Sequence, residues 1–436
     1  MAKPAYYPQL QDMRQRVRKM VDAAADMGAD SFLLDSMWWG AAARQGDFSI
    51  GLGDFTVDPV RFPDGLKVVS DYVHQQGMLF ALWFEFERVD IRTANKGRNP
   101  WKPEWLMHQQ GYPYRSWCQH VFMMCFGVQA AAEWALENLS WAVREYGVDW
   151  FMIDSNEWAV CDDPTHDHGP NDGEWAQIQG LYYILRGLRQ QFPKLIIDNG
   201  AGGSQRGDFA MARLCDLMPC SDINAPSVMN RQYSRGYGAL YPVYYARQGV
   251  HYYPTRETGP VSRTDPTSFT EPYSALDNGD DLSLERDEWR MLCRMMGIFQ
   301  PIYDFSTLAP ERLALLKKVI ATYKKIRPTL HGDRYVLSAP PFFVERENRE
   351  HGNWEVYEHL SLDRRLVAVF LYRCRSLRAE HRVALRGLDP EAQYRLESHR
   401  GMPPQTRSGA ELMGAGFTCS LPSQRNAEVL ILTRQS

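Results

Sequence analysis

Several features that mark other protein classes are missing from this sequence of 436 residues. None of the eight cysteines forms a CxxC pair, which argues against a zinc ribbon and a dense disulfide scaffold. We expect the cysteines to be reduced and mostly structural. The net charge of -4 provides no basic field for nucleic acid and no polybasic surface for a membrane, so neither partner is expected.

Long apolar runs are missing as well. The start at Met1-Ala2-Lys3-Pro4 leads into a polar segment without the apolar core of a secretory signal, and no uncharged run is long enough to span a bilayer. These absences predict a cytoplasmic protein. The sequence has no internal repeat and no low-complexity segment. Its length allows a large core and predicts two domains.

What the sequence does contain is an apolar run that stops at a carboxylate, and this pattern occurs four times. The runs are of strand length and end at Asp35, Glu85, Asp154 and Asp198. Because loops gather at the C-terminal ends of parallel strands, these acids are candidates for chemistry. A single Asp in this position is more often a helix N-cap, but the repetition favours a site.

Helical patterns alternate with these strands. We expect helices over 10–28, 66–76, 128–146, 175–191, 284–298 and 310–326. We expect strands over 32–35, 78–85, 150–154, 194–198, 214–218, 251–253 and 301–305. Such alternation implies parallel strands with right-handed crossovers. Carboxylates at successive strand ends, without a GxGxxG or P-loop motif, favour a (β/α)8 TIM-type barrel over a doubly wound sheet.

One barrel strand is not visible in the pattern. It would precede residue 10, so the first strand is short, missing or supplied differently. From about residue 330 the pattern changes to short strands separated by turn residues, at 335–337, 354–358, 366–371, 394–396 and 429–432. This is typical of an antiparallel β-sandwich. We therefore predict a barrel over 1–329 and a C-terminal sandwich over 330–436.

The motifs at the strand ends resemble glycoside hydrolase family 36, the α-galactosidase family of clan D. Residues 32–40, FLLDSMWWG, are similar to the family's FVLDDGWFG, and residues 77–87, GMLFALWFEFE, to GMKFGLWFEPE. Residues 151–157 occupy the position of the family's YIKWDMNR motif, and residues 198–208 that of its ENCSSGGGRFD motif. Each match is modest, but their shared order covers nearly the whole chain. The resemblance implies a barrel with a trailing sandwich, without the family's large N-terminal sandwich.

The resemblance also implies a retaining α-glycosidase with two carboxylates. Residue-by-residue transfer places the nucleophile at Asp154 and the acid/base at Asp222. Retention requires one ionised carboxylate for attack at the anomeric carbon and a second, protonated one for the leaving oxygen. In isolation, Asp222 would be read as an ordinary turn residue. A carbohydrate is the expected partner, with no cofactor or metal, and the chain could form a homo-oligomer.

The expected sugar-binding positions follow from the same alignment. They are Asp35, Ser36, Trp38, Trp83, Glu85, Met152, Asn156, Asp198, Gly200, Gly202, Arg206 and Asp208. Three of them depart from the family: Ser36 replaces an aspartate, Met152 a lysine and Gly200 a cysteine. Losing a cation and a carboxylate from the pocket would cost about 1–3 kcal/mol each if unreplaced. We infer that the chemistry is kept and that the bound sugar has changed.

Other interpretations of these residues stay open. Arg206 and Asp208 could form a loop ion pair, and Glu87 could either support the site beside Glu85 or be solvated. Residues 161–168, CDDPTHDH, suggest a metal-dependent isomerase or lyase, although such a run is more often a solvated loop. The chain could also be a non-catalytic carbohydrate-binding relative or a transglycosidase. The sequence names neither the sugar nor the linkage.

Overall fold

The computed structural model describes residues 13–36, 38–40, 49–116, 120–155, 157–203, 205–219, 227–251, 283–302, 305–340 and 352–435. The chain forms two compact units, Met1–Met218 and Pro219–Ser436. This division is not the domain boundary expected at 329/330, which stays a prediction. Among the described residues, no helix has both the length and the apolar character needed to cross a bilayer.

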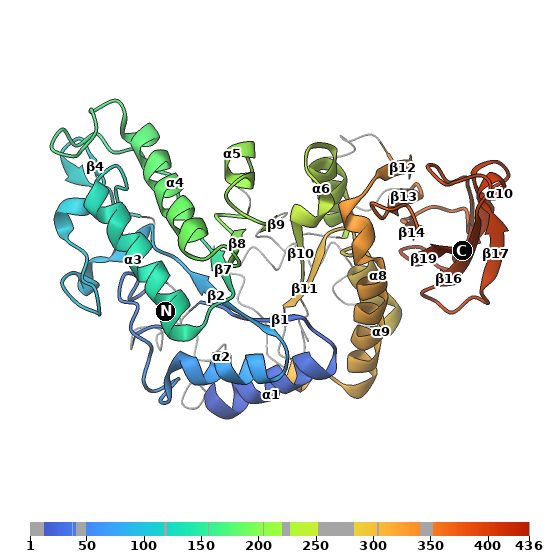
Figure 1. The fold of residues 1–436 in the computed structure, drawn as a ribbon, viewed down its shortest axis with the longest axis horizontal. Helices are drawn as coiled ribbons and strands as arrows, with labels where there is room; N and C mark the ends of the chain where they lie inside the picture. The colour runs from blue at the N-terminus through green and yellow to red at the C-terminus, as the bar shows by residue number, and fades with distance from the viewer. Residues whose placement is uncertain are drawn as a thin grey trace. The chain divides into compact units, whose positions relative to one another are not determined.

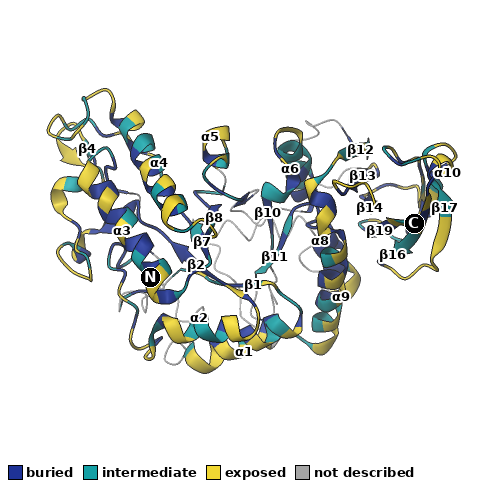
Figure 2. Cartoon of the chain, viewed as in Figure 1, coloured by how far each residue is buried: buried dark blue, intermediate teal, exposed yellow. Residues whose placement is uncertain are grey.

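A four-stranded parallel sheet forms the centre of the first unit. Its order is β1 (Ser31–Leu34), β2 (Leu79–Phe84), β7 (Trp150–Ile153) and β8 (Ile196–Asn199). The strands β2 and β7 are buried along nearly their whole length (Figure 2). Burial on both faces explains why the sequence shows continuous apolar runs here instead of alternation.

A helix precedes each strand of this sheet. The helices are α1 (Met13–Asp26), α2 (Gly65–Gln75), α3 (Gln129–Tyr146) and α4 (Gly173–Gln191), and α3 lies beside α4 (Figure 1). In α1, Val17, Val21 and Ala24 form the buried stripe. The helix α3 ends where Gly147 adopts a left-handed conformation with φ of 65°, as expected of a glycine C-cap. The first unit therefore has the predicted alternation.

Short elements extend the loops at the C-terminal ends of these strands. Strand β3 (Arg88–Asp90) pairs with β6 (Val121–Met123), and β4 (His108–Gln109) pairs with β5 (Tyr112–Pro113). The 3-10 helices are η3 (Ile91–Thr93) and η4 (Pro103–Trp105), and α5 (Phe209–Ala212) follows β8. These two-stranded ribbons were not predicted, because strands of two or three residues have no readable period.

The second unit begins with helices and a short parallel sheet. Its elements are α6 (Ser227–Leu240), η5 (Val243–Tyr245), β10 (Ala246–His251), α8 (Leu284–Leu292), β11 (Ile298–Ile302), η6 (Phe305–Thr307), α9 (Pro310–Ile326) and η7 (Arg327–His331). Strands β10 and β11 pair in parallel. The two-residue strand β9, Met218–Pro219, lies at the division between the units.

Four boundaries in this part of the chain were predicted wrongly. The strand expected over 301–305 corresponds to β11, which is described from Ile298 to Ile302, and Phe305 begins η6. The strand expected over 251–253 is β10, and the described part of it runs from Ala246 to His251. The strand expected over 214–218 starts only at Met218, and the helix expected to reach 298 ends at Leu292. A Cβ on Gly297 would lie 2.3 Å from the carbonyl oxygen of Ala246. Gly297 therefore lies close against the backbone of β10, one residue before β11 begins at Ile298.

Two antiparallel sheets complete the second unit. The larger has the order β12 (Arg334–Ser338), β13 (Glu355–Leu360), β14 (Leu366–Tyr372), β19 (Ala427–Arg434), β16 (Gln393–Ser398) and β17 (Gln405–Ser408). The smaller pairs β15 (Glu380–Val383) with β18 (Phe417–Ser420), and α10 (Gly409–Met413) lies between β17 and β18. A shared core that includes Val369, Leu430, Val383 and Cys419 joins the sheets, as in the predicted sandwich.

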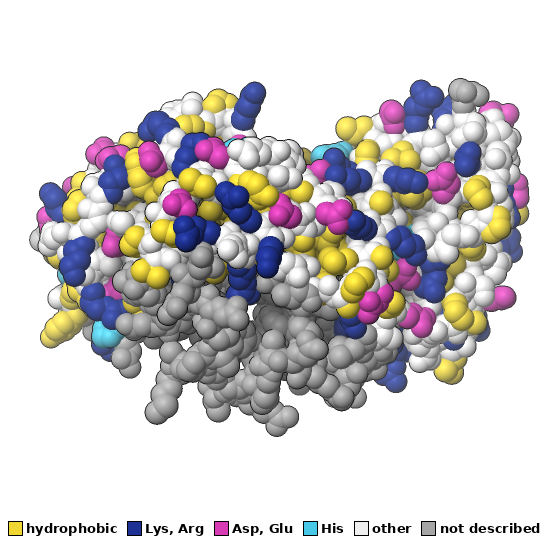
Figure 3. Space-filling view, turned by 90° about the horizontal axis from the view of Figure 1, so that it is seen from below, with side chains coloured by type: hydrophobic (Ala, Val, Ile, Leu, Met, Phe, Trp, Pro, Cys, Tyr) yellow, Lys and Arg dark blue, Asp and Glu magenta, His cyan; other side chains and the backbone are white. Residues whose placement is uncertain are grey.

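The surface carries no large patch of one charge on the face shown in Figure 3, as far as the described residues cover it. Lysine and arginine side chains alternate there with aspartate, glutamate and apolar groups (Figure 3). This distribution matches the small net charge of -4. It gives the described part of this face no long-range attraction for a polyanion.

Candidate functional site

Asp154 lies immediately after the last residue of β7, where the strand pattern placed it. Its backbone N–H donates to the carbonyl of Phe84 at 3.1 Å, so the end of β7 is held against the end of β2. The carboxylate accepts two long hydrogen bonds, from the indole Nε1 of Trp83 to Oδ2 at 3.3 Å and from the backbone of Gly202 to Oδ1 at 3.4 Å. These bonds fix the direction of the carboxylate. Asp154 is 9% exposed, so it is not completely shielded from solvent.

Sheet register explains which side chains surround Asp154. Trp83 of β2 is paired with Met152 of β7, and Met152 with Asp198 of β8. Residues in register on neighbouring parallel strands project from the same face of a sheet. Trp83, Met152 and Asp198, three of the predicted site residues, therefore form one row across the sheet. The next row along the strands is Phe84, Ile153 and Asn199.

Two buried ion pairs lie beside this row. Glu85 makes a two-bond pair with Arg88, and its second bond, from Nη2 to Oε2, is 2.9 Å long. Glu87 makes a similar pair with Arg206, with a bond from Nη2 to Oε2 of 2.8 Å. Glu85, Glu87 and Arg88 are almost completely buried. The suggestion that Glu87 is solvated was therefore wrong, and Arg206 pairs with Glu87 instead of with Asp208.

The charges of this cluster influence one another. Burial raises the pKa of Glu85 to about 7; Arg88 opposes this rise, and the nearby Asp154 and Glu87 add to it. Burial disfavours the charge on Arg206, but Glu87, Asp154 and Glu85 together raise its pKa. Arg206 thus supplies a permanent positive charge to a group of three carboxylates. Such mutual perturbation is typical of functional sites, although structural ion pairs produce it as well.

Aromatic side chains form the next layer. Trp39 stacks on Trp83 with ring centroids 5.3 Å apart, and Trp38 donates its indole N–H to the carbonyl of Trp83 at 2.9 Å. Trp38 and Trp83 are both buried, so this hydrogen bond helps to hold the backbone of Trp83 in place. Trp158 is 45% exposed, and the guanidinium of Arg206 lies 5.2 Å from its ring centroid. An exposed indole face is suited to stacking on a sugar ring.

Glycines bring backbone close to the end of β7. A Cβ on Gly200 would lie 2.7 Å from the carbonyl oxygen of Ile153 and 3.6 Å from Cε of Met152. Gly202 has a φ of +50°, a conformation that glycine adopts without strain. The methyl end of Met152 therefore lies beside Gly200. Met152 and Gly200, which both differ from the residues of the family, are therefore neighbours.

The remaining predicted residues have varied settings. Asp35 is exposed after β1 and its Oδ1 accepts the backbone N–H of Ser36 at 2.6 Å, whereas Asp198 is fully buried in β8. Asp208 caps α5 by accepting from the backbone of Ala210 and Met211 at 2.8 and 2.9 Å. Asn156 and Asp222 lie outside the described residues. The structure thus gathers part of the predicted set around Asp154.

The predicted set did not include two residues that lie at the site, Glu87 and Trp158. Glu87 was considered only beside Glu85, and its pairing with Arg206 joins residues 119 positions apart. Trp158 was not among the predicted sugar-binding positions. Its position four residues beyond Asp154 could have indicated a place in the site.

The comparisons with known proteins assign the chain to a family. Residues 9–270 match the family model described as Melibiase, and residues 354–432 match the glycosyl hydrolase family 36 C-terminal domain. The class defined by fold and site is thus that of the barrel glycoside hydrolases. The chain belongs to glycoside hydrolase family 36, the melibiase family.

The curated relatives are distant and longer. The chain is 24% identical to probable alpha-galactosidase G of Aspergillus terreus over 428 residues, which are 96% of this chain and 52% of the relative. It is 24% identical to alpha-galactosidase 1 of Pediococcus pentosaceus over 410 residues, 92% of this chain and 50% of the relative. The chain therefore spans about half the length of the curated relatives it matches.

Solved structures confirm the fold. The structure of the alpha-galactosidase of Lactobacillus brevis matches with a TM-score of 0.76 at 23% identity. The match covers 97% of this chain and 53% of the Lactobacillus brevis chain. A variant of alpha-galactosidase AgaA of Geobacillus stearothermophilus, solved with stachyose, has a TM-score of 0.76 at 21% identity, with 98% and 54% covered. Another AgaA variant was solved with raffinose. The likeness confirms the predicted barrel with a C-terminal antiparallel sheet domain.

Proposed function

We propose that the chain is a retaining α-glycosidase of the α-galactosidase type with a changed sugar pocket. One observation carries the proposal: the carboxylate of Asp154 lies at the end of β7 between the Trp83 indole and the Gly202 backbone, beside the Glu87–Arg206 pair. Family membership gives this arrangement its chemical meaning. The named relatives are alpha-galactosidases, and stachyose and raffinose were bound to AgaA variants.

In this mechanism the carboxylate of Asp154 attacks the anomeric carbon. The two N–H donors contact one carboxylate oxygen each and thereby fix the direction of attack. Arg206, whose pKa is raised by Glu87, Asp154 and Glu85, supplies a positive charge beside the proposed nucleophile. The product of this step is a glycosyl ester of Asp154, which water then hydrolyses.

Asp222 is the proposed acid/base. It would protonate the leaving oxygen in the first step and take a proton from water in the second. In retaining glycosidases the two carboxyl groups are about 5–5.5 Å apart. This assignment rests on the alignment of Ser221-Asp222 with the family motif.

The proposed change of sugar follows from Ser36, Met152 and Gly200. The Met152 methyl lies beside Gly200, so an apolar surface stands where the family has a lysine and a cysteine. Without the lysine, a sugar hydroxyl in this position would lose a charge-assisted hydrogen bond, worth about 1.5–3 kcal/mol. We therefore expect a sugar with a less polar or larger substituent at this position to be preferred over galactose.

A panel of aryl α-glycosides tests the function. The sugars should differ from galactose in one substituent at a time, and the enzymes should be the wild type, Asp154→Asn and the control Asp149→Asn. Asp149 precedes β7 at the opposite end of the strand and pairs with His74. We expect turnover of at least one glycoside by the wild type and the control, and none by Asp154→Asn.

The same panel separates the alternatives. Sugar binding without turnover of any glycoside would indicate a non-catalytic carbohydrate-binding protein, the second candidate that the changed pocket residues suggest. Unchanged turnover by Asp154→Asn would show that the proposed nucleophile is wrong. Mass analysis of the products distinguishes hydrolysis from transfer to a second sugar.

A further inference from the structure

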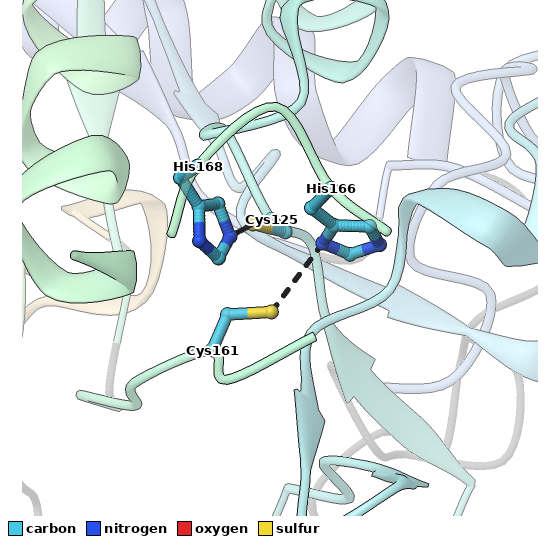
Figure 4. Close-up of side chains that lie close together, drawn as sticks. All are labelled: Cys125, Cys161, His166 and His168. Carbon is cyan, nitrogen blue, oxygen red and sulfur yellow. Dashed lines mark hydrogen bonds between the residues drawn. The ribbon is translucent and has the colours of Figure 1, made fainter. Parts of the chain in front are cut away.

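Four potential metal ligands converge beside the loop that follows β7. Cys125 follows β6 and precedes α3, Cys161 lies between β7 and α4, and His166 and His168 lie in the same β7–α4 segment. Their ligand atoms all lie within 4.8 Å of one another. Figure 4 shows the two sulfur atoms and the two imidazole rings pointing toward a common centre. Both cysteines are fully buried, so the segment is not the uniformly solvated loop that its composition predicts.

Hydrogen bonds determine which ring nitrogens face this centre. Nε2 of His166 lies 3.0 Å from the carbonyl oxygen of Glu104, and Nδ1 of His168 lies 2.9 Å from the carbonyl oxygen of Gly169. A carbonyl oxygen can only accept, so these two nitrogens carry the protons. Nδ1 of His166 and Nε2 of His168 are therefore the nitrogens left to bind an ion, and these two face the sulfur atoms. A carbonyl that fixes the tautomer is the usual partner of a metal-bound histidine.

The separations fit a tetrahedral ion. Sγ of Cys161 lies 3.4 Å from Nδ1 of His166, and Sγ of Cys125 lies 3.3 Å from Nε2 of His168. With Zn–S bonds of about 2.3 Å and Zn–N bonds of about 2.0–2.1 Å, tetrahedral geometry places sulfur and nitrogen about 3.5 Å apart. Two cysteines and two histidines are also a donor set that zinc prefers in structural sites.

The surrounding backbone is arranged for thiolates. The N–H of His108 donates to Sγ of Cys161 at 3.4 Å, and the backbone of Asp163 bonds to the same sulfur. The backbone of Gly127 and Val128 bonds to Cys125. A Cβ on Gly127 would lie 2.6 Å from Cδ2 of His168, so only glycine lets this ring approach Cys125 closely. Backbone groups from four residues are thus directed at the two sulfur atoms, as is common around metal-bound cysteines.

We propose that Cys125, Cys161, His166 and His168 bind one Zn²⁺ in a closed, structural site. All four positions of a tetrahedral ion are filled by protein, so the site has no open position for substrate or water. The ion ties the β7–α4 segment to the chain between β6 and α3. Cys161 is three residues beyond Trp158, so the ion also anchors the segment that carries this exposed indole.

Metal analysis of the full-length chain tests the site. The protein should be purified without a histidine tag, and its zinc content measured by mass spectrometry of the metal. The test variants are Cys125→Ser, Cys161→Ser and His168→Gln; the matched control is Cys215→Ser, a buried free cysteine outside the cluster. We expect one zinc ion per chain in the wild type and the control. We expect the zinc content to fall to background in all three test variants.

Cobalt substitution keeps the test independent of variant folding. Wild-type protein stripped with a chelator and reloaded with Co²⁺ should show the visible absorption of a tetrahedral site and a sulfur-to-cobalt charge-transfer band. Chelation should lower the midpoint of thermal unfolding, and Zn²⁺ should restore it. These readouts do not depend on glycosidase activity, so failure of the zinc site and failure of the proposed function are distinguishable.

Three results would overturn the proposal. The first is wild-type protein that contains no zinc and takes up neither Zn²⁺ nor Co²⁺. The second is full zinc content in a Cys125→Ser, Cys161→Ser double variant, because the ion would then be bound elsewhere. The third is a Cys125–Cys161 disulfide in the purified protein, seen as a mass lower by two hydrogen atoms than that of the reduced chain.

Discussion

The indole N–H of Trp83 donates to Oδ2 of Asp154 across the β2–β7 boundary, at 3.3 Å. Trp39 stacks on the same indole, and Trp38 bonds to its backbone carbonyl. The direction of the N–H is therefore set by aromatic packing and not by a flexible side chain. This relationship connects the core of the first unit to the proposed nucleophile, and it leads to the first prediction.

Replacing Trp83 by phenylalanine removes this donor but keeps an aromatic ring. Hydrogen bonds to charged groups are worth about 1.5–3 kcal/mol, so we expect kcat to fall about tenfold to a hundredfold with a smaller change in KM. Steady-state kinetics on the best aryl α-glycoside measures both constants. The control is Trp134→Phe, whose indole N–H bonds to the carbonyl of Asn99. Equal losses in the two variants would show that the effect is general destabilisation.

The Glu87–Arg206 pair should couple strongly in stability. Removing one partner leaves a buried charge, which costs about 3–5 kcal/mol, whereas replacing both partners by apolar groups can be nearly neutral. We expect Glu87→Met and Arg206→Met each to lower the free energy of unfolding by this amount, and the double variant to lose less than either. Urea unfolding of the four proteins completes the cycle. Additive losses would mean that the pair contributes no coupling.

Gly202 should be required for activity more than for stability. Alanine at a positive φ costs about 1–2 kcal/mol, and its Cβ would lie 2.6 Å from Cδ of Gln205. The backbone must then shift, and with it the N–H bonded to Asp154. We expect Gly202→Ala to reduce kcat sharply. Gly77→Ala is the matched control, because Gly77 has a φ of +75° and its Cβ would meet no described atom within 4 Å. It should lose similar stability and keep kcat.

His359 of β13 should make the second unit sensitive to acid. Burial, with a contribution from Arg334, lowers the pKa of His359 to about 3, and neither ring nitrogen has a hydrogen-bond partner among the described residues. The unfolded chain takes up a proton below about pH 6.5 and the folded chain does not. The stability from this group is therefore complete above about pH 6.5 and is lost as the pH falls toward 3.

The variant His359→Phe should flatten this dependence. For the wild type, the folding equilibrium constant should fall by up to about tenfold per pH unit below 6.5 through this group alone. Thermal unfolding between pH 4 and 7, compared with the control His331→Gln from η7, measures the difference in slope. The neighbouring Glu358, whose pKa burial raises to about 8, acts in the opposite direction above pH 4.5. An identical pH slope in wild type and His359→Phe would contradict the prediction.

Elements of both units that have strong local signals follow from the sequence. The helix predicted over 310–326 is α9 without a change of boundary, and Asp154 was placed at its strand end by the apolar run before it. Strand β10 was displaced in the prediction because its residues are polar: Gln248 is buried against the hydroxyl of Ser234, and Arg247 bonds to Gln300. Tertiary hydrogen bonds outweigh the missing apolar pattern there.

The rest of the candidate site depends on contacts between distant segments. No local pattern joins Glu87 to Arg206, or Cys125 to Cys161, which lies 36 positions further along the chain. The 161–168 run suggested a metal site, but a solvated loop was the preferred interpretation because the run has no helical ligand spacing and the sequence has no CxxC pair. The strand order brings these segments together, since β2, β7 and β8 are adjacent. Only the folded chain shows which cysteine faces which histidine.

Azide rescue of Asp154→Gly tests the central claim most directly. Azide can enter the space left by the carboxylate and attack the anomeric carbon of an aryl α-glycoside from the side on which Asp154 stood. If Asp154 is the nucleophile, the inactive variant should regain turnover with azide and release a β-glycosyl azide, identified by NMR of the product. An α-glycosyl azide, or full turnover by the variant without azide, would contradict the account.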